Sequence, residues 1–244
     1  MKQFGLIGYP LSHSFSKGYF AEKFLKENIE DCSYDVFPLE KIEDFNSLCE
    51  QHQNLVGLNV TIPYKQQIIS FLDELDETAA NIGAVNTIKF INNKKIGFNT
   101  DAFGFEMSLQ PLLKSHHQQA LILGTGGASK AVEFVLKKLG ISFQYVSRNK
   151  NENAITYSEL NEDIIHHSTL IINSTPIGMY PNIEVSPNVP YHFLSDKHLL
   201  YDLIYNPEET QFLKEGKQRG AQTKNGLEML YLQAERSWQI WNNI

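Results

Sequence analysis

Cysteine is scarce in this sequence of 244 residues, which contains only Cys32 and Cys49. Two thiols at this separation lack zinc-type spacing and cannot form the multiple disulfides on which small secreted domains depend. The histidines are also poorly placed for a metal, because the adjacent pairs His116–His117 and His166–His167 point to different sides of a helix or strand. No HExxH pattern occurs. We therefore expect no metal site, and we interpret these histidines as surface or turn residues.

Long hydrophobic runs and an excess of positive charge are absent as well. No apolar run approaches the roughly 20 residues that span a bilayer, and the first residues lack the pattern of a secretory signal. The formal net charge is −7, from 21 Lys and Arg against 28 Asp and Glu. This balance disfavours a general surface for nucleic acid or anionic membranes. We expect a cytoplasmic protein with no nucleic-acid or membrane partner.

Apolar strand-like runs alternate with amphipathic helical ones along most of the chain. Strands are predicted at 4–8, 34–39, 56–62, 84–91, 120–124, 143–147, 169–173 and 199–203. Helices are predicted at 17–27, 42–51, 65–75, 129–139, 210–218 and 227–241. This alternation implies an α/β protein with parallel sheets and helices on both faces. A second βαβ series begins near Asp101, so we predict two domains, one of residues 1–100 plus 227–244 and one of residues 101–226.

A glycine-rich turn follows the predicted strand 120–124 directly and leads into a helix. The turn and the helix start contain Gly124, Thr125, Gly126, Gly127, Ala128 and Ser129. A tight turn before a helix N-terminus lets the backbone approach a phosphate, and the helix presents unpaired N–H groups to it. The pattern predicts dinucleotide binding, although Ser129 replaces the third glycine of G-x-G-x-x-G. The alternative is an ordinary structural turn.

The end of the next predicted strand indicates which dinucleotide binds. It reads Ser147-Arg148-Asn149-Lys150, without the acidic residue that binds the ribose 2′-hydroxyl in NAD sites. An arginine instead offers a planar fork of donors to a 2′-phosphate. Arg148, with Lys150 as a second basic residue, therefore favours NADP. A solvated basic loop is the alternative interpretation.

Two polar segments, 59–65 and 99–104, lie where a predicted strand gives way to a helix. In open α/β sheets the carboxyl ends of the strands line the ligand crevice. Lys65 could donate a proton in this crevice, and Asp101 could be the carboxylate that orients it. Taken singly, however, Asp101 is a good helix N-cap and Lys65 a typical surface lysine.

At this point the sequence resembles the shikimate dehydrogenase family, because eight motifs occur in the family's order. They are Ser12-His13-Ser14-Phe15-Ser16, Asn59-Val60-Thr61-Ile62-Pro63-Tyr64-Lys65, Gly83-Ala84-Val85-Asn86-Thr87, Asn99-Thr100-Asp101, Gly124–Ser129, Asn173-Ser174-Thr175-Pro176-Ile177-Gly178-Met179, Tyr205-Asn206-Pro207-Glu208-Glu209-Thr210 and Asn225-Gly226-Leu227-Glu228-Met229-Leu230 with Gln233. The resemblance implies a substrate-binding and catalytic domain (1–100 plus 227–244) and a Rossmann-type NADP domain (101–226). The implied reaction is the reversible, NADPH-dependent reduction of 3-dehydroshikimate to shikimate, in aromatic amino acid biosynthesis.

The same resemblance implies a role for individual residues. Lys65 and Asp101 would be the catalytic pair. The implied substrate-binding residues are Ser14 and Ser16 for the carboxylate, Thr61 and Tyr205 in support, and Asn59, Asn86 and Gln233 for the ring hydroxyls. Thr175, Leu203 and Gly226 would join the glycine turn and Arg148 in binding NADP. Without the family context, each of these residues is equally well explained as a cap, a turn residue or a buried polar group.

One departure from the family pattern bears on the cofactor. The family usually has Asn-Arg-Thr after the second strand of the cofactor domain, with a basic residue three positions later. Here the triplet is Ser147-Arg148-Asn149, and Glu152 occupies the usually basic position. Three alternatives stay open: a quinate/shikimate dehydrogenase with broader substrate or NAD use, a non-catalytic NADP-binding protein on the same fold, and a structural interaction module. The protein is expected to be a monomer or a homodimer.

Overall fold

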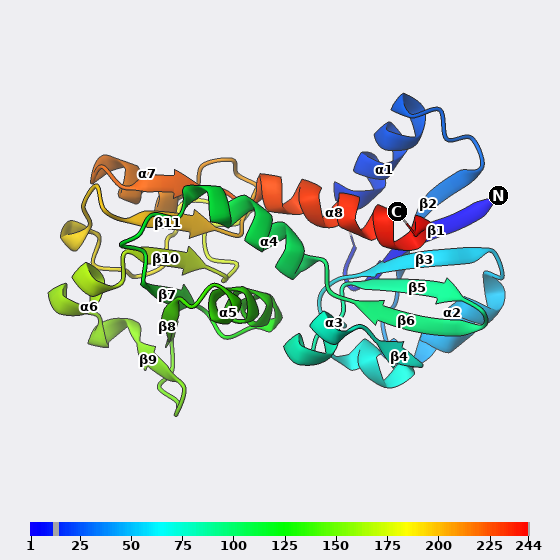
Figure 1. The fold of residues 1–244 in the computed structure, drawn as a ribbon, viewed down its shortest axis with the longest axis horizontal. Helices are drawn as coiled ribbons and strands as arrows, with labels where there is room; N and C mark the ends of the chain where they lie inside the picture. The colour runs from blue at the N-terminus through cyan, green and yellow to red at the C-terminus, as the bar shows by residue number, and fades with distance from the viewer. Residues whose placement is uncertain (12–14, 244) are drawn as a thin grey trace. The chain divides into compact units, whose positions relative to one another are not determined.

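The chain forms two compact units. The computed structural model describes residues 1–11 and 15–243, and it separates them into Met1–Thr100 with Ala234–Ile244, and Asp101–Gln233. Each unit is built on its own six-stranded sheet (Figure 1). The division falls inside the last helix, α8 (Leu227–Asn242), so one continuous helix contributes residues to both units. No helix among the described residues is long and apolar enough to cross a membrane.

The first unit contains a mixed sheet with strand order β2-β1-β3-β5-β6-β4. Its strands are β1 (Lys2–Gly8), β2 (Cys32–Pro38), β3 (Leu55–Val60), β4 (Glu74–Leu75), β5 (Thr87–Ile91) and β6 (Lys94–Phe98). Strand β5 is antiparallel to both β3 and β6, so the expectation of a parallel sheet is wrong for this unit. For β5 and β6 the reason is the two-residue connection Asn92-Asn93, with φ of 51° and 60°, because so short a loop can join only antiparallel strands.

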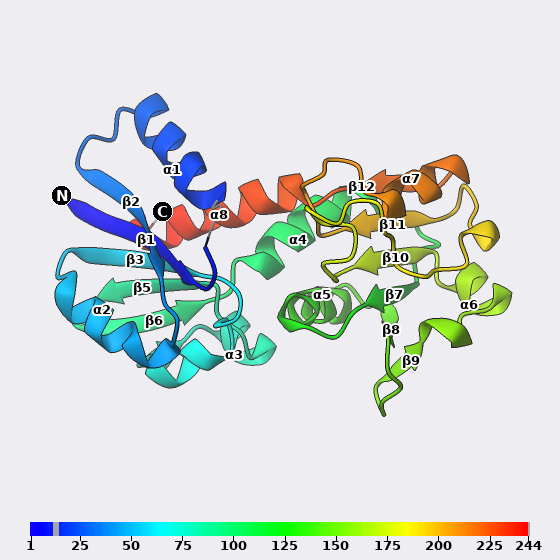
Figure 2. The same ribbon diagram turned by 180° about the vertical axis from the view of Figure 1, so that it is seen from behind.

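Helices cover both faces of this sheet (Figure 2). They are α1 (Phe15–Lys26), α2 (Phe45–Gln51), α3 (Glu77–Ile82), the end of α8, and the 3-10 turns η1 (Ile42–Asp44) and η2 (Gln67–Phe71). On one face α1 and α8 enclose an aromatic core that includes Phe4, Phe20, Trp238 and Trp241. Gly57 permits this packing, because a Cβ there would lie 2.2 Å from the Trp241 ring nitrogen.

The helix predicted at 65–75 is wrong. The chain instead makes turns up to Gln66, then η2 and the short strand β4. The backbone N–H groups of Asp73 and Asp76 donate to Lys95 and Gly97 at 2.9 Å each, so this segment pairs with β6 and not with itself. Its apolar residues have helical spacing, but pairing with a distant strand overrides that local preference.

The second unit is a parallel doubly wound sheet with strand order β12-β11-β10-β7-β8-β9. Its strands are β7 (Gln119–Leu123), β8 (Ser142–Ser147), β9 (Ala154–Thr156), β10 (Leu170–Asn173), β11 (Leu199–Asp202) and β12 (Gln222–Lys224). Counted from β7 as the first strand, this order is 3-2-1-4-5-6, the order of the Rossmann fold. The predicted fold class, with a Rossmann-type unit beside a second α/β unit, is confirmed.

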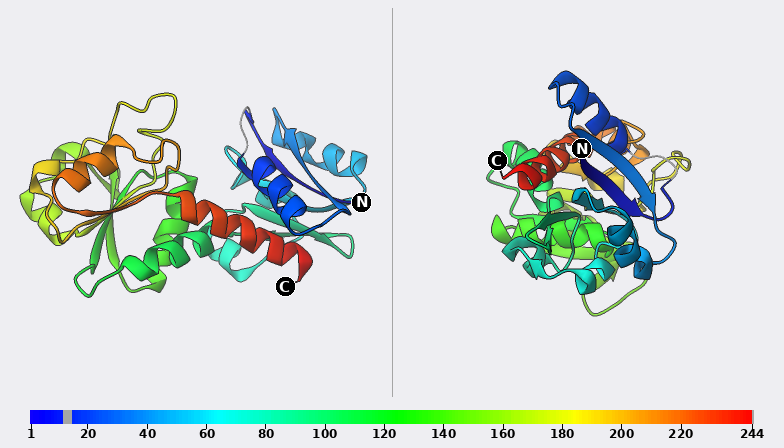
Figure 3. Two further views of the ribbon diagram at one scale, coloured as in Figure 1. Left: turned by 90° about the horizontal axis from the view of Figure 1, so that it is seen from above. Right: turned by 90° about the vertical axis from the view of Figure 1, so that its right-hand side faces the viewer.

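Successive side chains of a strand point to opposite faces of the sheet. In the second unit, a layer of helices covers each of these faces (Figure 3). The helices are α4 (Asp101–Leu109), α5 (Gly127–Lys138), α6 (Glu162–His167), α7 (Gln211–Gln218) and the start of α8, with the 3-10 turns η3 (Gln110–Leu112), η4 (Tyr157–Glu159) and η5 (Tyr191–Phe193). Leu200 packs in the cluster that includes α6 and α7. The next residue, Tyr201, packs edge-on against Phe105 of α4, with 5.1 Å between the ring centroids. Its hydroxyl lies 2.6 Å from the Ser108 hydroxyl, at hydrogen-bond distance.

Candidate active site

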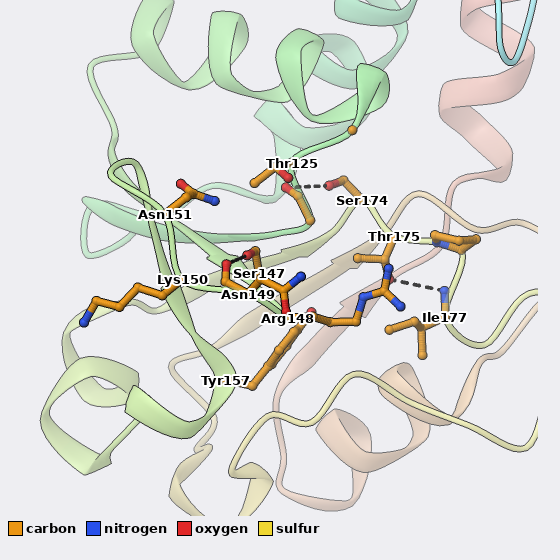
Figure 4. Close-up of a pocket in the computed structure, with 13 residues that line it drawn as sticks. Thr125, Ser147, Arg148, Asn149, Lys150, Asn151, Tyr157, Ser174, Thr175 and Ile177 are labelled. Atoms are coloured by element: carbon orange, nitrogen blue, oxygen red, sulfur yellow. Dashed lines mark hydrogen bonds between the residues drawn. The ribbon is translucent and has the colours of Figure 1, made fainter.

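A pocket of about 500 Å³ opens at the carboxyl ends of β7, β8 and β10 (Figure 4). It is lined by Gly124, Thr125, Gly126, Ser147, Arg148, Asn149, Lys150, Asn151, Tyr157, Ser174, Thr175, Pro176 and Ile177. Strands β7 and β10 are neighbours, and their connections to the sheet run in opposite directions. Such a switch point is where open α/β sheets bind ligands.

The glycine turn lines one side of this pocket with backbone atoms of Gly124, Thr125 and Gly126. Gly124 has φ of +98°, and a Cβ there would lie 2.7 Å from the Thr175 methyl group, so a side chain is excluded by conformation and by space. Around Gly126 and Gly127 nothing lies within 4 Å of a built Cβ. Gly126 caps α5 without a side-chain hydrogen bond. An anion can therefore approach the N–H groups at the start of this twelve-residue helix.

The remaining residues of the predicted motif begin helix α5. Gly127, Ala128 and Ser129 lie in its first turn and do not line the pocket. The buried Ser129 hydroxyl donates to the Gly126 carbonyl at 2.7 Å, which ties the turn to the helix. A third glycine is not needed at this position, because the serine side chain is accommodated in the core.

The two basic residues of the pocket are placed differently. Arg148 is exposed and its guanidinium extends toward Thr175 and Ile177, whereas Lys150 points to the opposite side (Figure 4). The Lys150 ammonium lies 2.6 Å from the Glu159 carboxylate. Hydrogen bonds from Lys150 and Thr156 lower the pKa of Glu159 to about 2, so this carboxylate is ionised over the whole physiological pH range. Arg148 therefore dominates the positive charge that faces the pocket.

A buried carboxylate that the sequence analysis did not single out supports the opposite wall. Asp202 accepts hydrogen bonds from Asn173 at 3.0 Å, Ile204 N–H at 3.0 Å and Thr210 at 2.6 Å. Asn173 in turn accepts from the Thr175 hydroxyl at 2.6 Å. Burial raises the pKa of Asp202 to about 6 despite these donors. An acid at the end of the otherwise apolar run Leu199–Asp202 was the available sequence signal.

Leu203 and Gly226, also predicted to bind cofactor, contact each other outside this pocket. A Cβ on Gly226 would lie 2.1 Å from the Leu203 carbonyl oxygen, so only glycine fits. The Gly226 N–H donates to the Ile204 carbonyl at 3.0 Å. These contacts bring the start of α8 against the end of β11.

In the first unit, a cluster of buried hydroxyl and amide groups lies at the ends of β3, β5 and β6. Its members are Asn59, Asn86, Thr87, Thr100 and Ser237. The Asn59 amide donates to Thr87 at 3.2 Å and to Ser237 at 3.0 Å. The Asn86 side chain donates to Thr100 at 2.9 Å and accepts from the Thr100 N–H at 2.7 Å. Two predicted residues, Asn59 and Asn86, thus share one network with Thr87, Thr100 and Ser237, to which the sequence analysis assigned no role.

Tyr34 connects this cluster to helix α1. Its hydroxyl donates to the Asn59 oxygen at 2.8 Å and hydrogen-bonds Ser16 in the first turn of α1. Burial strongly raises the pKa of Tyr34, so the phenol remains a hydrogen-bond donor. Ser14, the other predicted carboxylate ligand, falls outside the described residues.

Lys65 and Thr61 lie in the turns between β3 and η2. Lys65 is half-buried, and its carbonyl accepts from the Val85 N–H at 2.7 Å, which places it beside the segment that contains Asn86. The Thr61 N–H donates to Ile7 at 2.9 Å, which ties the turn to β1. The sequence predicted that Lys65 begins an α-helix. No α-helix directly follows Pro63, so this prediction is wrong.

Three further predicted residues belong to the second unit. Asp101 is the half-buried first residue of α4 and directly follows Thr100 in the chain. Tyr205 is 37% exposed, and partial burial raises its pKa. Gln233 is half-buried, and its amide donates to the Leu230 carbonyl at 3.0 Å. The described residues contain no group of three or more His, Cys, Asp or Glu that could hold a metal ion.

The Rossmann strand order, the glycine turn and the pocket at the switch point define a dinucleotide-binding α/β protein. Residues 6–88 match the family model of the shikimate dehydrogenase substrate binding domain. A shikimate dehydrogenase (NADP(+)) of Methanococcus maripaludis is 42% identical over 260 residues, which cover 98% of this chain and 91% of the relative. The chain belongs to the shikimate dehydrogenase family.

Solved structures agree over the whole chain. A shikimate dehydrogenase in complex with NADP+ is 36% identical, with a TM-score of 0.87 over 100% of this chain and 91% of the other. The Thermus thermophilus shikimate 5-dehydrogenase in complex with NADP(H) and shikimate is 29% identical, with a TM-score of 0.88 over 100% and 94%. The family predicted from the ordered motifs is thus confirmed.

Proposed function

We propose that this protein catalyses the reversible, NADPH-dependent reduction of 3-dehydroshikimate to shikimate in the shikimate pathway. One observation carries the proposal: a chain with a Rossmann switch-point pocket and Arg148 at its mouth is similar over its full length to NADP-dependent shikimate dehydrogenases. The glycine turn leaves room for a pyrophosphate, and Arg148 offers a planar cation to a 2′-phosphate. The chemistry of the pocket therefore fits NADP.

We assign the substrate and catalytic role to residues 1–100 plus 227–244, and cofactor binding to residues 101–226. The match of residues 6–88 to a substrate-binding family model supports the first assignment. The pocket formed by the ends of β7, β8 and β10 supports the second. We further propose that the enzyme acts in the cytoplasm as a monomer or homodimer, which light scattering of the purified protein would distinguish.

In this proposal the cofactor is held by N–H groups of the turn Gly124–Ser129 and by Arg148 and Thr175, with Leu203 and Gly226 farther along the sheet edge. When bound, NADPH supplies the hydride. Thr175 suits its place because Asn173 and Asp202 fix its hydroxyl and backbone. The pocket wall is thereby rigid before the ligand arrives, which reduces the entropy lost on binding.

The substrate side of the proposal rests on the hydrogen-bonding residues that the family resemblance implies. Ser14 and Ser16 would bind the carboxylate, with Thr61 and Tyr205 in support, and Asn59, Asn86 and Gln233 would read the ring hydroxyls. Asn59 and Asn86 are well suited, because the buried cluster fixes which way each amide faces.

Lys65 would donate a proton to the oxygen of the substrate carbonyl as negative charge develops there. Asp101 would orient the Lys65 ammonium and the neighbouring substrate hydroxyl. The hydrogen bond from the Val85 N–H to the Lys65 carbonyl holds this lysine beside the segment that contains Asn86. The proposed proton donor and one proposed hydroxyl ligand are therefore fixed to neighbouring backbone segments.

The direct test follows the absorbance of reduced nicotinamide with shikimate or quinate as substrate and NADP or NAD as cofactor. We expect the highest kcat/KM for shikimate with NADP. Comparable rates with quinate or NAD would instead indicate a broader quinate/shikimate dehydrogenase. NADPH binding without turnover of either substrate would indicate a non-catalytic protein, and no nucleotide binding would indicate a structural module.

A further inference from the structure

The hydroxyl group of Tyr157 is an unusual feature of the cofactor pocket. The oxygen is buried, yet it has no hydrogen-bond partner among the described residues. Tyr157 also lines the pocket beside Arg148. A buried polar group without a partner destabilises a fold by about 1–3 kcal/mol, so such a group in a ligand pocket is a candidate donor to the ligand.

The backbone around Tyr157 holds its ring in place. Tyr157 is the first residue of η4, whose N-cap Thr156 forms a reciprocal capping box with Glu159. Figure 4 shows the hydroxyl end of the ring directed toward Arg148. Burial raises the pKa of this tyrosine, while the positive charge of Arg148 opposes the shift. The group is a neutral phenol at physiological pH, and it can donate a hydrogen bond.

The same turn pairs with the second basic residue of the pocket. Glu159 holds the Lys150 ammonium at 2.6 Å, and Lys150 points away from Arg148. Glu152, which stands where the resemblance leads one to expect a basic residue, adds no positive charge. The Tyr157 hydroxyl is a buried, unpartnered donor in the same pocket as Arg148, so it can supply a 2′-phosphate there with a second hydrogen bond.

We propose that Tyr157 is a specificity-determining residue, whose hydroxyl donates a hydrogen bond to the 2′-phosphate of NADP(H) together with the Arg148 guanidinium. This inference rests on the proposed use of NADP. Arg148 is exposed, so its side chain has room to turn with the phosphate and uncover the phenol. Hydrogen bonds to an ionised phosphate are shorter and about twice as strong as neutral ones. NAD(H) has no group for this donor.

The test compares Tyr157→Phe with wild type in direct binding of NADPH, NADH and 2′,5′-ADP by calorimetry. Phenylalanine keeps the ring and removes only the hydroxyl. We expect the affinity for NADPH and 2′,5′-ADP to fall roughly ten- to hundredfold, the loss of one charge-assisted hydrogen bond. NADH affinity should change less than about twofold, since that ligand lacks the phosphate.

Tyr191→Phe is the matched control. It removes the hydroxyl of another tyrosine of the second unit, which donates to the Pro187 carbonyl at 2.7 Å and does not line the cofactor pocket, so NADPH affinity should stay within about threefold of wild type. Equal NADPH affinity of Tyr157→Phe and wild type would overturn the inference. Parallel losses for NADPH and NADH would overturn it too, because they indicate a structural role for the ring. The binding readout requires no turnover, so a selective loss supports Tyr157 even if shikimate is not oxidised.

Discussion

The Asn59 amide of β3 donates a hydrogen bond of 3.0 Å to the Ser237 hydroxyl of α8, across 178 positions of the chain. Ser237 is fully buried and also lies 2.8 Å from the Thr87 hydroxyl and 3.2 Å from that of Thr100. One small hydroxyl on α8 thereby joins the ends of three strands. Ser237 is thus a positioning residue for the two amides that we assign to the substrate.

Ser237→Ala should therefore weaken both folding and substrate binding. The change leaves buried partners of the hydroxyl unsatisfied, which should lower the free energy of unfolding by about 1–3 kcal/mol. A less constrained Asn59 should raise the KM for shikimate severalfold, with a smaller effect on kcat. Urea denaturation and steady-state kinetics would measure the two effects.

Ser108→Ala provides the comparison. Ser108 is a similarly buried serine of the second unit, and its hydroxyl hydrogen-bonds Tyr201 of the same unit. The substitution should lower stability to a similar degree and leave the KM for shikimate unchanged. A rise in KM of the same size in both variants would mean that Ser237 acts only through general stability.

Lys65→Ala should lower kcat by roughly 10²–10⁴-fold, the usual contribution of a positioned general acid. NADPH affinity should stay nearly unchanged, because Lys65 does not line the dinucleotide pocket. Stopped-flow or steady-state assays give kcat, and fluorescence titration gives the affinity. Lys41→Ala removes an exposed lysine of the same unit and should be without effect. Turnover of Lys65→Ala near wild type would exclude Lys65 from the mechanism.

Arg148→Ala should weaken NADPH binding at least roughly tenfold while changing NADH affinity much less, because only NADPH carries the phosphate that the guanidinium can bind. Arg148→Lys keeps the charge but loses the planar fork, so we expect an intermediate affinity. Calorimetric titration of the three proteins with both cofactors would test this. Equal losses for NADPH and NADH would contradict a phosphate-binding role.

Asp202 should make stability fall as pH rises from about 4 to 6. Its pKa is about 6 in the folded protein and 3.8 in the unfolded chain, so in this window the folded state holds a proton that the unfolded state has released. The difference of about two pKa units corresponds to a loss of about 3 kcal/mol by neutral pH. The loss is complete above the folded pKa.

Asp202→Asn keeps the side-chain shape and removes the ionisation. The stability of the variant relative to wild type should therefore increase with pH across that window, as denaturation at pH 4.5 and pH 7 would measure. A constant difference between the two proteins at both pH values would mean that Asp202 titrates normally in the folded state.

Much of the second unit was predictable, because its signals are local. The strands 120–124 and 143–147, the glycine turn and the following helix each have a sequence pattern that tertiary contacts reinforce. The short strands β9 and β12 and helix α6 were missed, since three to six residues carry too little periodicity to be recognised.

The first unit was less predictable, because distant contacts decide its structure. The Asn92-Asn93 hairpin turn was overlooked, although paired asparagines at positive φ suit such a turn. The segment 65–75 follows its pairing with β6 and not its helical spacing. In the site, Asn59 and Asn86 were identified through the family motifs. Ser237 and Tyr157 belong to no motif, and the roles we propose for them rest only on their burial and their neighbours.

The return of residues 234–244 to the first unit has a consequence for the newly made chain. The ribosome produces residues 101–233 as one uninterrupted stretch, so that unit can fold as soon as it emerges. The first hundred residues must wait longer, because Trp238 and Trp241 cover Phe4 and Phe20 only after translation reaches them. During that interval the partners of this aromatic core are absent, and the nascent protein is then most vulnerable to aggregation.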